Sequence, residues 1–166
     1  MSRDEIALFT QKAEAVSAVV RTVASLDEAF AYTVDICLNK EACQLLMSGC
    51  EGAVSDEAAE LCAAKSSERV IAAPGLPDDQ SALLAAAAEK AGVRLISDGL
   101  RNHPAGIDIG LAVADLGLAE TGTVVLDSSS EDLRLSSMIS EIHVVVLPVS
   151  RPVSYTHLTL PTIYSV

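Results

Sequence analysis

Residues 70–96 read VIAAPGLPDDQSALLAAAAEKAGVRLI, and this stretch decides the fold class. The apolar run at 70–73 stops at a Pro-Gly pair, as a buried strand does. Asp78 is placed to cap a Leu- and Ala-rich helix that ends before Gly92, and residues 93–96 form the next short apolar run. Strand, helix and strand in this order make a βαβ unit, which predicts parallel strands and an α/β fold.

Upstream of this unit the pattern predicts helices over residues 1–66. One apolar stripe recurs every three or four positions and predicts a long first helix: Ile6, Phe9, Ala13, Val16, Val20 and Val23. A capping box, Ser25 with Glu28, starts a second helix. Its expected buried residues are Phe30, Val34, Cys37 and Leu38. A third helix is expected over residues 55–65, because Ser55 is followed by two acids.

Downstream, residues 67–150 are expected to form the α/β core. Residues 109–118 are apolar and Ala-rich, and they predict a short helix followed by a short strand near 118–119. A strand at 123–126, a helix at 133–140 and a buried strand at 142–147 follow. From Pro148 onward no acid and no alanine occurs, so residues 151–166 are interpreted as a non-native or disordered tail.

Composition and charge exclude several classes of protein. The chain has 166 residues, about one domain, and a formal net charge of −12. Nucleic-acid binding needs a basic patch, and anionic membranes repel an acidic chain, so neither partner is expected. No apolar run reaches the roughly 20 residues of a membrane span, and the acidic N-terminus is unlike a signal peptide, so we expect a cytoplasmic protein.

The four cysteines match no metal-binding run. They are Cys37, Cys43, Cys50 and Cys62, spaced C-x5-C-x6-C-x11-C. This spacing fits neither a zinc site nor an iron–sulfur cluster motif, and all three histidines lie far downstream. We therefore expect no metal in this chain and interpret the thiols as small, reduced core residues.

The strongest polar feature lies between two expected strands, at Glu120-Thr121-Gly122-Thr123. One interpretation is a tight turn with Gly122 at positive φ. The other is a ligand site beyond a strand end, with a carboxylate, two hydroxyls and closely approachable backbone N–H groups. No dinucleotide-binding, P-loop or nucleophile-elbow motif occurs elsewhere in the chain.

Two further residues admit two interpretations each. Arg134 can clamp a carboxylate or phosphate, or it can pair with the adjacent acids Glu131 and Asp132. His143 opens a very apolar strand, where it is either a core histidine or a general base.

These residues carry a family resemblance. Residues 114–130, ADLGLAETGTVVLDSSS, then LRL at 133–135 and EIHVVVLP at 141–148, resemble the lactate utilization protein C family, the LUD-domain proteins. Ala114, Asp115 and Ala119–Thr123 match the first motif, Arg134 with Leu135 the second, and His143 with its valines the third. The resemblance covers roughly residues 70–148.

The resemblance implies a three-layer, Rossmann-like sandwich similar to the NagB/RpiA/CoA-transferase fold, with a helical N-terminal segment. It implies a non-cluster subunit of a complex that oxidises L-lactate to pyruvate, whose partner subunits are iron–sulfur proteins. This chain would then bind no cofactor itself. The expected ligand-binding residues, for a small 2-hydroxy acid, are Asp115, Glu120, Thr121, Gly122, Thr123, Ser128, Arg134 and His143.

The family implies no transferable catalytic residue, and Glu120 and His143 are the candidates by position. Two C-terminal family motifs, Gly-Pro-Ser-Arg-x-Ala-Asp-Ile-Glu and Gly-x-His-Gly-Pro, do not occur here, so we expect a truncated form with an aberrant tail. Two alternative functions stay open. One is a stand-alone enzyme of the phosphosugar-isomerase or CoA-transferase type, and the other is a non-catalytic assembly or regulatory module, which can be oligomeric.

Overall fold

The computed structural model describes residues 3–40, 55–57, 59–60, 63, 68–103, 106–127, 129–149 and 152–153. The chain divides into two compact units. The larger unit comprises residues 23–112 and 128–146, and the smaller comprises residues 1–22, 113–127 and 147–166. The sequence-based division at residues 66 and 150, which follows helical periodicity and the change in composition, stays a prediction.

The larger unit is built on a four-stranded sheet with the order β2-β1-β3-β6. Its strands are β1 (Val70–Ala72), β2 (Arg94–Ile96), β3 (Ile107–Val113) and β6 (Ser140–Val146). β1 pairs in parallel with both β2 and β3, and α5 (Asp78–Ala91) connects β1 to β2. The predicted βαβ unit and α/β fold class are therefore confirmed.

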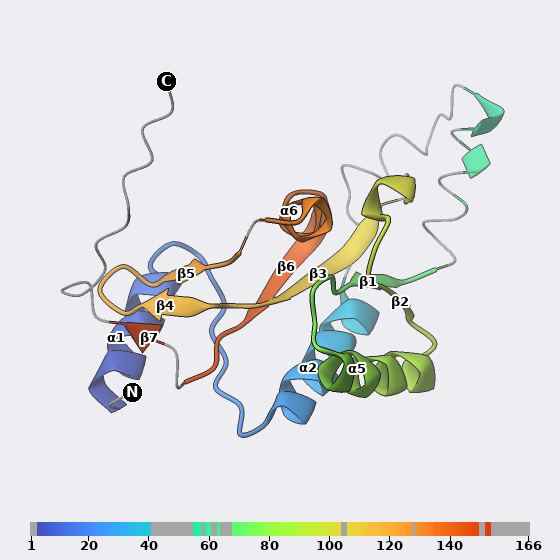
Figure 1. Ribbon diagram of the computed structural model, residues 1–166. Helices are drawn as coiled ribbons and strands as arrows, with labels where there is room; N and C mark the ends of the chain where they lie inside the picture. Colours follow the sequence, from blue (N-terminus) through green and yellow to red (C-terminus); the bar gives the residue numbers. More distant parts are fainter. Residues whose placement is uncertain are drawn as a thin grey trace. The chain divides into compact units, whose positions relative to one another are not determined.

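Helices lie on both faces of this sheet (Figure 1). α2 (Leu26–Asn39) and α5 lie on one face, and α6 (Glu131–Met138) lies on the other. The main core lies between the sheet and the helices α2 and α5. In it Phe30, Ile71, Leu84 and Ile109 are fully buried. Burying one such side chain contributes about 1.5–3 kcal/mol, so this layer is a principal source of stability.

The predicted start of α2 is correct, whereas two other predictions about α2 and α5 are wrong. The Ser25 hydroxyl accepts a hydrogen bond from the Glu28 amide at 3.2 Å, which confirms the predicted start of α2. The prediction that Leu38 is buried is wrong, because it is 47% exposed near the end of α2. Asp78 is not the cap of α5 either. Pro77 occupies that position without a side-chain hydrogen bond, and Asp78 is the first helical residue.

The smaller unit contains α1 (Arg3–Glu14) and a sheet of order β5-β4-β7. Its strands are β4 (Leu116–Leu118), β5 (Thr123–Val125) and β7 (Pro152–Val153). The first helix is shorter than its apolar stripe predicted, because the chain turns at Ser17, which has a φ of 69°. Val16 is 73% exposed, so the stripe beyond Glu14 does not form a buried helical face.

The helix predicted within residues 109–118 is wrong, because β3 occupies Ile107–Val113. Six of its seven residues are buried, and a strand buried on both faces has the same continuous apolar composition as a buried helix. The packing of α6 also requires a small residue here. A β-carbon on Gly110 would collide with the Ser136 carbonyl and lie 2.7 Å from the Ser140 hydroxyl.

Parts of the N-terminal prediction lie outside the described residues. These include the thiols of Cys43, Cys50 and Cys62 and five positions of the third helix predicted at 55–65, whose described residues Asp56, Glu57, Ala59, Glu60 and Ala63 are helical. Cys37 is described and is fully buried in the core, as expected. Within the described ranges, no helix combines the length and the apolar character that crossing a membrane requires.

Candidate functional site

The polar motif at residues 120–123 lies in a β-hairpin of the smaller unit. β4 and β5 pair antiparallel, with Leu118 opposite Thr123, so residues 119–122 form the turn. The Gly122 amide donates to the Leu118 carbonyl at 2.9 Å, and Gly122 has a φ of 66°. Glycine reaches this region at low cost, so the turn interpretation of this motif is confirmed. The turn does not decide whether the motif also binds a ligand.

The turn lies against the end of α1 at Gly122. A β-carbon there would lie 2.7 Å from the carbonyl carbon of Lys12 and closer still to the amide nitrogen of Ala13. Ala13 itself is only 4% exposed. Gly122 is thus required twice, once by its backbone angle and once by this close approach. The turn therefore packs directly against the C-terminal part of α1.

The side chains of the hairpin differ in availability. Glu120, Thr121 and Thr123 are exposed, so a ligand can reach them. The Asp115 carboxylate accepts a hydrogen bond from the Asp127 amide at 2.6 Å, and the Asp115 amide donates to the Val125 carbonyl at 2.9 Å. Asp115 thereby closes the open end of the hairpin, which gives this motif residue a structural task.

In the larger unit the sheet order identifies the place where ligands bind in folds of this class. In the sheet, β2 lies on one side of β1 and β3 lies on the other. The chain therefore changes direction across the sheet after β2, and the switch point lies between β1 and β3. Ligands of open α/β sheets bind beyond the carboxyl ends of two such strands. β3 ends at Val113, and the chain reaches Asp115 of the hairpin two residues later.

The loop that leaves β1 has an unusual charge for a phosphate-binding loop. Phosphate sites use the partial positive charge at a helix N-terminus. Here the first turn of α5 carries Asp78 and Asp79, whose negative carboxylates already offset the partial positive charge of the helix N-terminus. Leu133 of α6 covers the loop as well, with its side chain 3.4 Å from a β-carbon placed on Gly75. This loop is therefore poorly suited to phosphate.

Arg134 projects from α6 and is exposed. Its guanidinium donates to the Ser129 carbonyl at 3.4 Å. Of the adjacent acids, Glu131 pairs with Arg101, and Asp132 accepts from the Leu100 amide at 3.0 Å. Arg134 thus lies on an accessible helix face, where its role in binding stays a prediction.

His143 lies in β6 and is partly buried. Its neighbours Ile142 and Val144 contact the main core, so strand alternation directs His143 to the opposite face of the sheet. Its Nε2 atom is buried and has no hydrogen-bond partner among the described residues. Desolvation lowers the pKa of His143 below 6.5, so the imidazole is neutral at pH 7. A neutral imidazole can accept a proton.

A buried ion cluster at the amino ends of β1 and β3 was missed by the sequence analysis. Asp108 is fully buried and contacts the Lys40 ammonium at 2.9 Å and the Arg69 guanidinium at 3.2 Å. Lys40 also contacts Glu141 at 2.6 Å, and the Val70 amide donates to Asp108 at 2.7 Å. These residues are up to 101 positions apart, so no local pattern reveals the cluster.

The charges of this cluster compensate one another. Burial by itself would lower the pKa of Lys40, but hydrogen bonds and attraction from Glu141 and Asp108 outweigh it and raise that pKa above 10.5. Lys40 is therefore a permanent ammonium ion in the folded state. Two cations and two carboxylates bonded to one another make this cluster a structural element that joins α2, β1, β3 and β6.

The predicted site residues fall into three groups. Asp115 and residues 120–123 belong to the smaller unit, and Arg134 and His143 belong to the larger one. Ser128 lies outside the described residues. The structure brings the hairpin residues together, and a single pocket that joins them to Arg134 and His143 stays a prediction.

The protein is of the α/β class. Its β3 strand pairs in parallel with β1 and is followed in the chain by the β4–β5 hairpin, whose turn contains Gly122. The LUD domain matches residues 6–159, nearly the whole chain, and the protein belongs to the LUD-domain family. This family is associated with lactate utilization. No curated protein and no solved structure matches the chain.

Proposed function

We propose that this chain is a subunit, of the lactate utilization protein C type, of a complex that oxidises L-lactate to pyruvate. The observation that carries the proposal is the LUD-domain match over residues 6–159, which contains the hairpin with its exposed Glu120. In the reaction, lactate loses two electrons and two protons. The electrons pass to iron–sulfur partner subunits, and this chain holds no cluster, in line with its cysteine spacing.

Three features of the chain are proposed to act on the substrate: His143, the turn at 120–123 and Arg134. The neutral imidazole of His143 is proposed to accept the hydroxyl proton, because its Nε2 is buried without a partner among the described residues. The exposed turn at 120–123 is proposed to contact the ligand through its hydroxyls, its backbone N–H groups and the Glu120 carboxylate, whose charge Glu120→Gln removes. Arg134 is proposed to bind the lactate carboxylate, since a guanidinium pairs with it in two parallel hydrogen bonds.

The alternative of a phosphosugar isomerase or CoA-transferase receives less support. Both would bring phosphate groups to the carboxyl ends of the strands. Asp78 and Asp79 at the first turn of α5 repel such groups there. The purified protein is therefore expected not to turn over phosphosugars or CoA thioesters.

The test is growth on L-lactate as sole carbon source. The gene is deleted, and the strain is complemented with the wild-type chain, with Glu120→Gln, with His143→Gln or with Glu89→Gln. Glu89 is exposed on α5, far in sequence from every proposed site residue, so it controls for the loss of one carboxylate. We expect wild type and Glu89→Gln to restore growth and the other two to fail.

Two outcomes would redirect the proposal. Normal growth of the deletion strain on L-lactate contradicts a role in lactate oxidation. Full complementation by both Glu120→Gln and His143→Gln, with no growth in the deletion strain, would show that the chain serves as an assembly module. Co-purification of iron–sulfur subunits with the tagged wild-type chain tests the proposed partners directly.

A further inference from the structure

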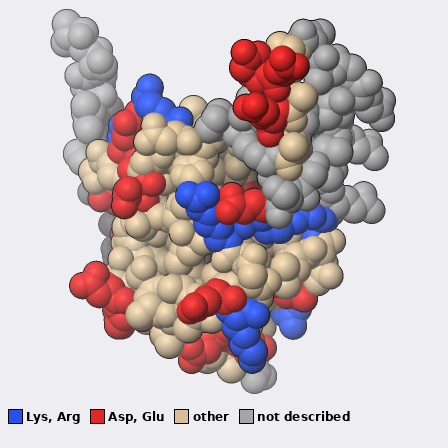
Figure 2. All heavy atoms as spheres, turned by 90° about the vertical axis from the view of Figure 1, so that its right-hand side faces the viewer, with Lys and Arg blue, Asp and Glu red and all other residues tan. Residues whose placement is uncertain are grey.

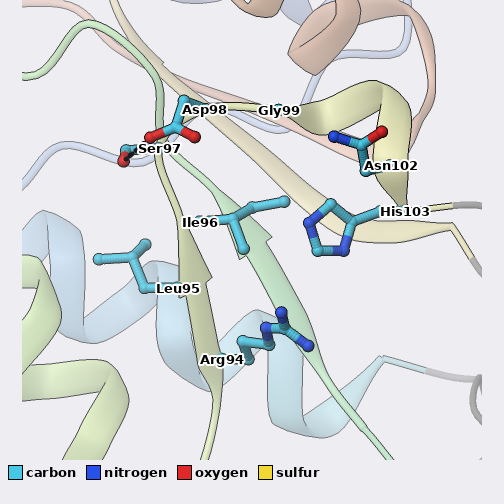
Figure 3. Close-up of a pocket in the computed structure, with 8 residues that line it drawn as sticks. All are labelled: Arg94, Leu95, Ile96, Ser97, Asp98, Gly99, Asn102 and His103. Atoms are coloured by element: carbon cyan, nitrogen blue, oxygen red, sulfur yellow. Dashed lines mark hydrogen bonds between the residues drawn. The ribbon is translucent and has the colours of Figure 1, made fainter.

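A hollow of about 390 Å³ lies beside β2, in the larger unit (Figure 3). It is lined by β2, by the loop that follows this strand and by the end of the short 3-10 helix η1 (Leu100–Asn102). Its volume falls in the range of about 300–1,000 Å³ that is usual for small-ligand sites. It contains no residue of the hairpin, and neither Arg134 nor His143 lines it.

The side chains of β2 alternate, and this decides which groups face the hollow. Arg94 and Ile96 extend to the same side of the strand as His103, whereas Leu95 and Ser97 point to the other side (Figure 3). The Asp98 carboxylate also points away, and the Ser97 hydroxyl lies 3.3 Å from it. Asp98 and the whole of β2 line the hollow as well, but the side chains of β2 on the same side as His103 are those of Arg94 and Ile96, so the side-chain donors come from Arg94, Asn102 and His103.

The donors are suited to a carboxylate. The Arg94 guanidinium offers a planar pair of N–H groups, and His103 and the Asn102 amide can add further donors. Ile96 provides an apolar surface between them and is 8% exposed. Figure 2 looks onto this side of the molecule, where basic side chains form a band across the middle with acidic side chains among them.

The present partner of Arg94 is exchangeable. Its guanidinium donates to both Glu68 oxygens, at 3.2 Å and 3.4 Å, and both side chains are about half exposed. Exposed ion pairs of this kind contribute little, so a carboxylate ligand can replace Glu68 or share the guanidinium with it. The net charge of −12 works against ligands that carry several negative charges.

We infer that this hollow binds a small monocarboxylate with a short apolar chain, held by Arg94 against Ile96. No residue of the β4–β5 hairpin lines this hollow, and the inference does not rest on the proposed role in lactate oxidation. A carboxylate would fit with its oxygens toward Arg94 and His103 and its carbon chain over Ile96.

The test is an NMR titration of the ¹⁵N-labelled full chain. Sodium propionate, sodium acetate and sodium L-lactate are each added at constant ionic strength, with propionamide as the neutral control of the same shape as propionate. We expect saturable shifts of amides in residues 94–103, with a dissociation constant in the range of about 1 mM. Propionamide should bind at least about 10-fold more weakly, because it lacks the charge.

Variants assign the binding to the hollow. Arg94→Gln should weaken propionate binding by about 10- to 100-fold, the usual effect of losing a charge-assisted hydrogen-bond pair. Arg101→Gln removes the same charge from an exposed arginine that pairs with Glu131 and does not line the hollow. It should change the affinity by less than about 2-fold. His103→Gln tests the same site independently if Arg94→Gln does not fold.

Three results would overturn the inference. The first is the absence of saturable shifts in residues 94–103 with any of the three carboxylates up to tens of millimolar. The second is equal binding of propionate and propionamide. The third is equal weakening by Arg94→Gln and Arg101→Gln, which would show general charge attraction instead of a site.

Discussion

The ion cluster around Asp108 and the hairpin turn at residues 119–122 use polar groups in opposite ways. Asp108 is fully buried, and its oxygens contact Lys40, Arg69 and the Val70 amide. In the turn, backbone geometry and the contact with α1 supply the order, and Glu120 stays exposed. Polar groups bonded to one another stabilise a fold, whereas polar groups held only through their backbone remain available to a ligand.

The largest effect is expected where the cluster is broken. Asp108→Asn removes the negative charge that Lys40 and Arg69 share, while the ammonium, which is 5% exposed, keeps its ion pair with Glu141. Breaking a buried ion pair in this way costs about 3–5 kcal/mol. Urea unfolding followed by circular dichroism measures this loss. Asp79→Asn, an exposed control, should change little, and a loss below about 1 kcal/mol for Asp108→Asn would show that the cluster is not structural.

The next effect concerns the turn itself, with a matched control at the end of α5. Gly122 and Gly92 have φ angles of 66° and 70°, but a β-carbon on Gly92 meets nothing within 4 Å. Alanine at either position bears a conformational cost of about 1–2 kcal/mol. Gly122→Ala also collides with Lys12 and Ala13 and should cost about 1–3 kcal/mol more.

Hydrogen exchange distinguishes the two glycine variants by location. In Gly122→Ala the amides of β4 and β5 should exchange faster, because the turn can no longer lie against α1. In Gly92→Ala the amides of the hairpin should exchange as in the wild type. Equal stability of the two variants would contradict the close approach of Gly122 to α1.

A smaller effect is expected from His143 and depends on pH. Its pKa is lowered in the folded state by desolvation, so protonation favours unfolding. The stability linked to this neutral imidazole is fully present above about pH 6.5 and is lost as pH falls through the folded-state pKa. His143→Gln should therefore show a shallower loss of stability than wild type between pH 7 and more acidic pH. Parallel curves for the two proteins would argue against a desolvated His143.

The smallest effect on stability is expected from Glu120→Gln. The side chain is exposed in the turn, and such substitutions usually change the free energy of unfolding by less than about 0.5 kcal/mol. The same variant is expected to abolish growth on L-lactate. A clear loss of stability would show that Glu120 supports the hairpin, and the contrast with Asp108 would then disappear.

Short-range patterns predicted much of the larger unit. The βαβ unit, the start of α2 at Ser25 and the end of α5 before Gly92 depend on signals within a few residues, and the structure confirms them. β3 was mistaken for a helix because both states bury a continuous apolar run. Its parallel pairing with β1, in which Ile71 lies opposite Ile109 and Ala72 opposite Gly110, decides the outcome.

In the candidate site, too, local features were predictable from the sequence and long-range contacts were not. The motif at 120–123 stands out in the sequence as a turn between strands, and Gly122 has the positive φ that was expected. Its contact with Lys12 and Ala13 was not foreseeable, because the two segments are more than 100 positions apart. The hollow beside β2 was missed for a related reason, since the loop after β2 and the η1 helix bring His103 to the same side of the strand as Arg94.

By itself, the sequence determined the α/β class, the hairpin motif and the family resemblance, because propensity, periodicity and motif spacing are local properties of the chain. Tertiary structure alone decided which polar groups became structural and which stayed exposed. Asp108 and Glu120 are both acids near the ends of strands, and no local signal separates them. Burial separates them, because a carboxylate removed from water must find cations and N–H donors wherever the fold brings them.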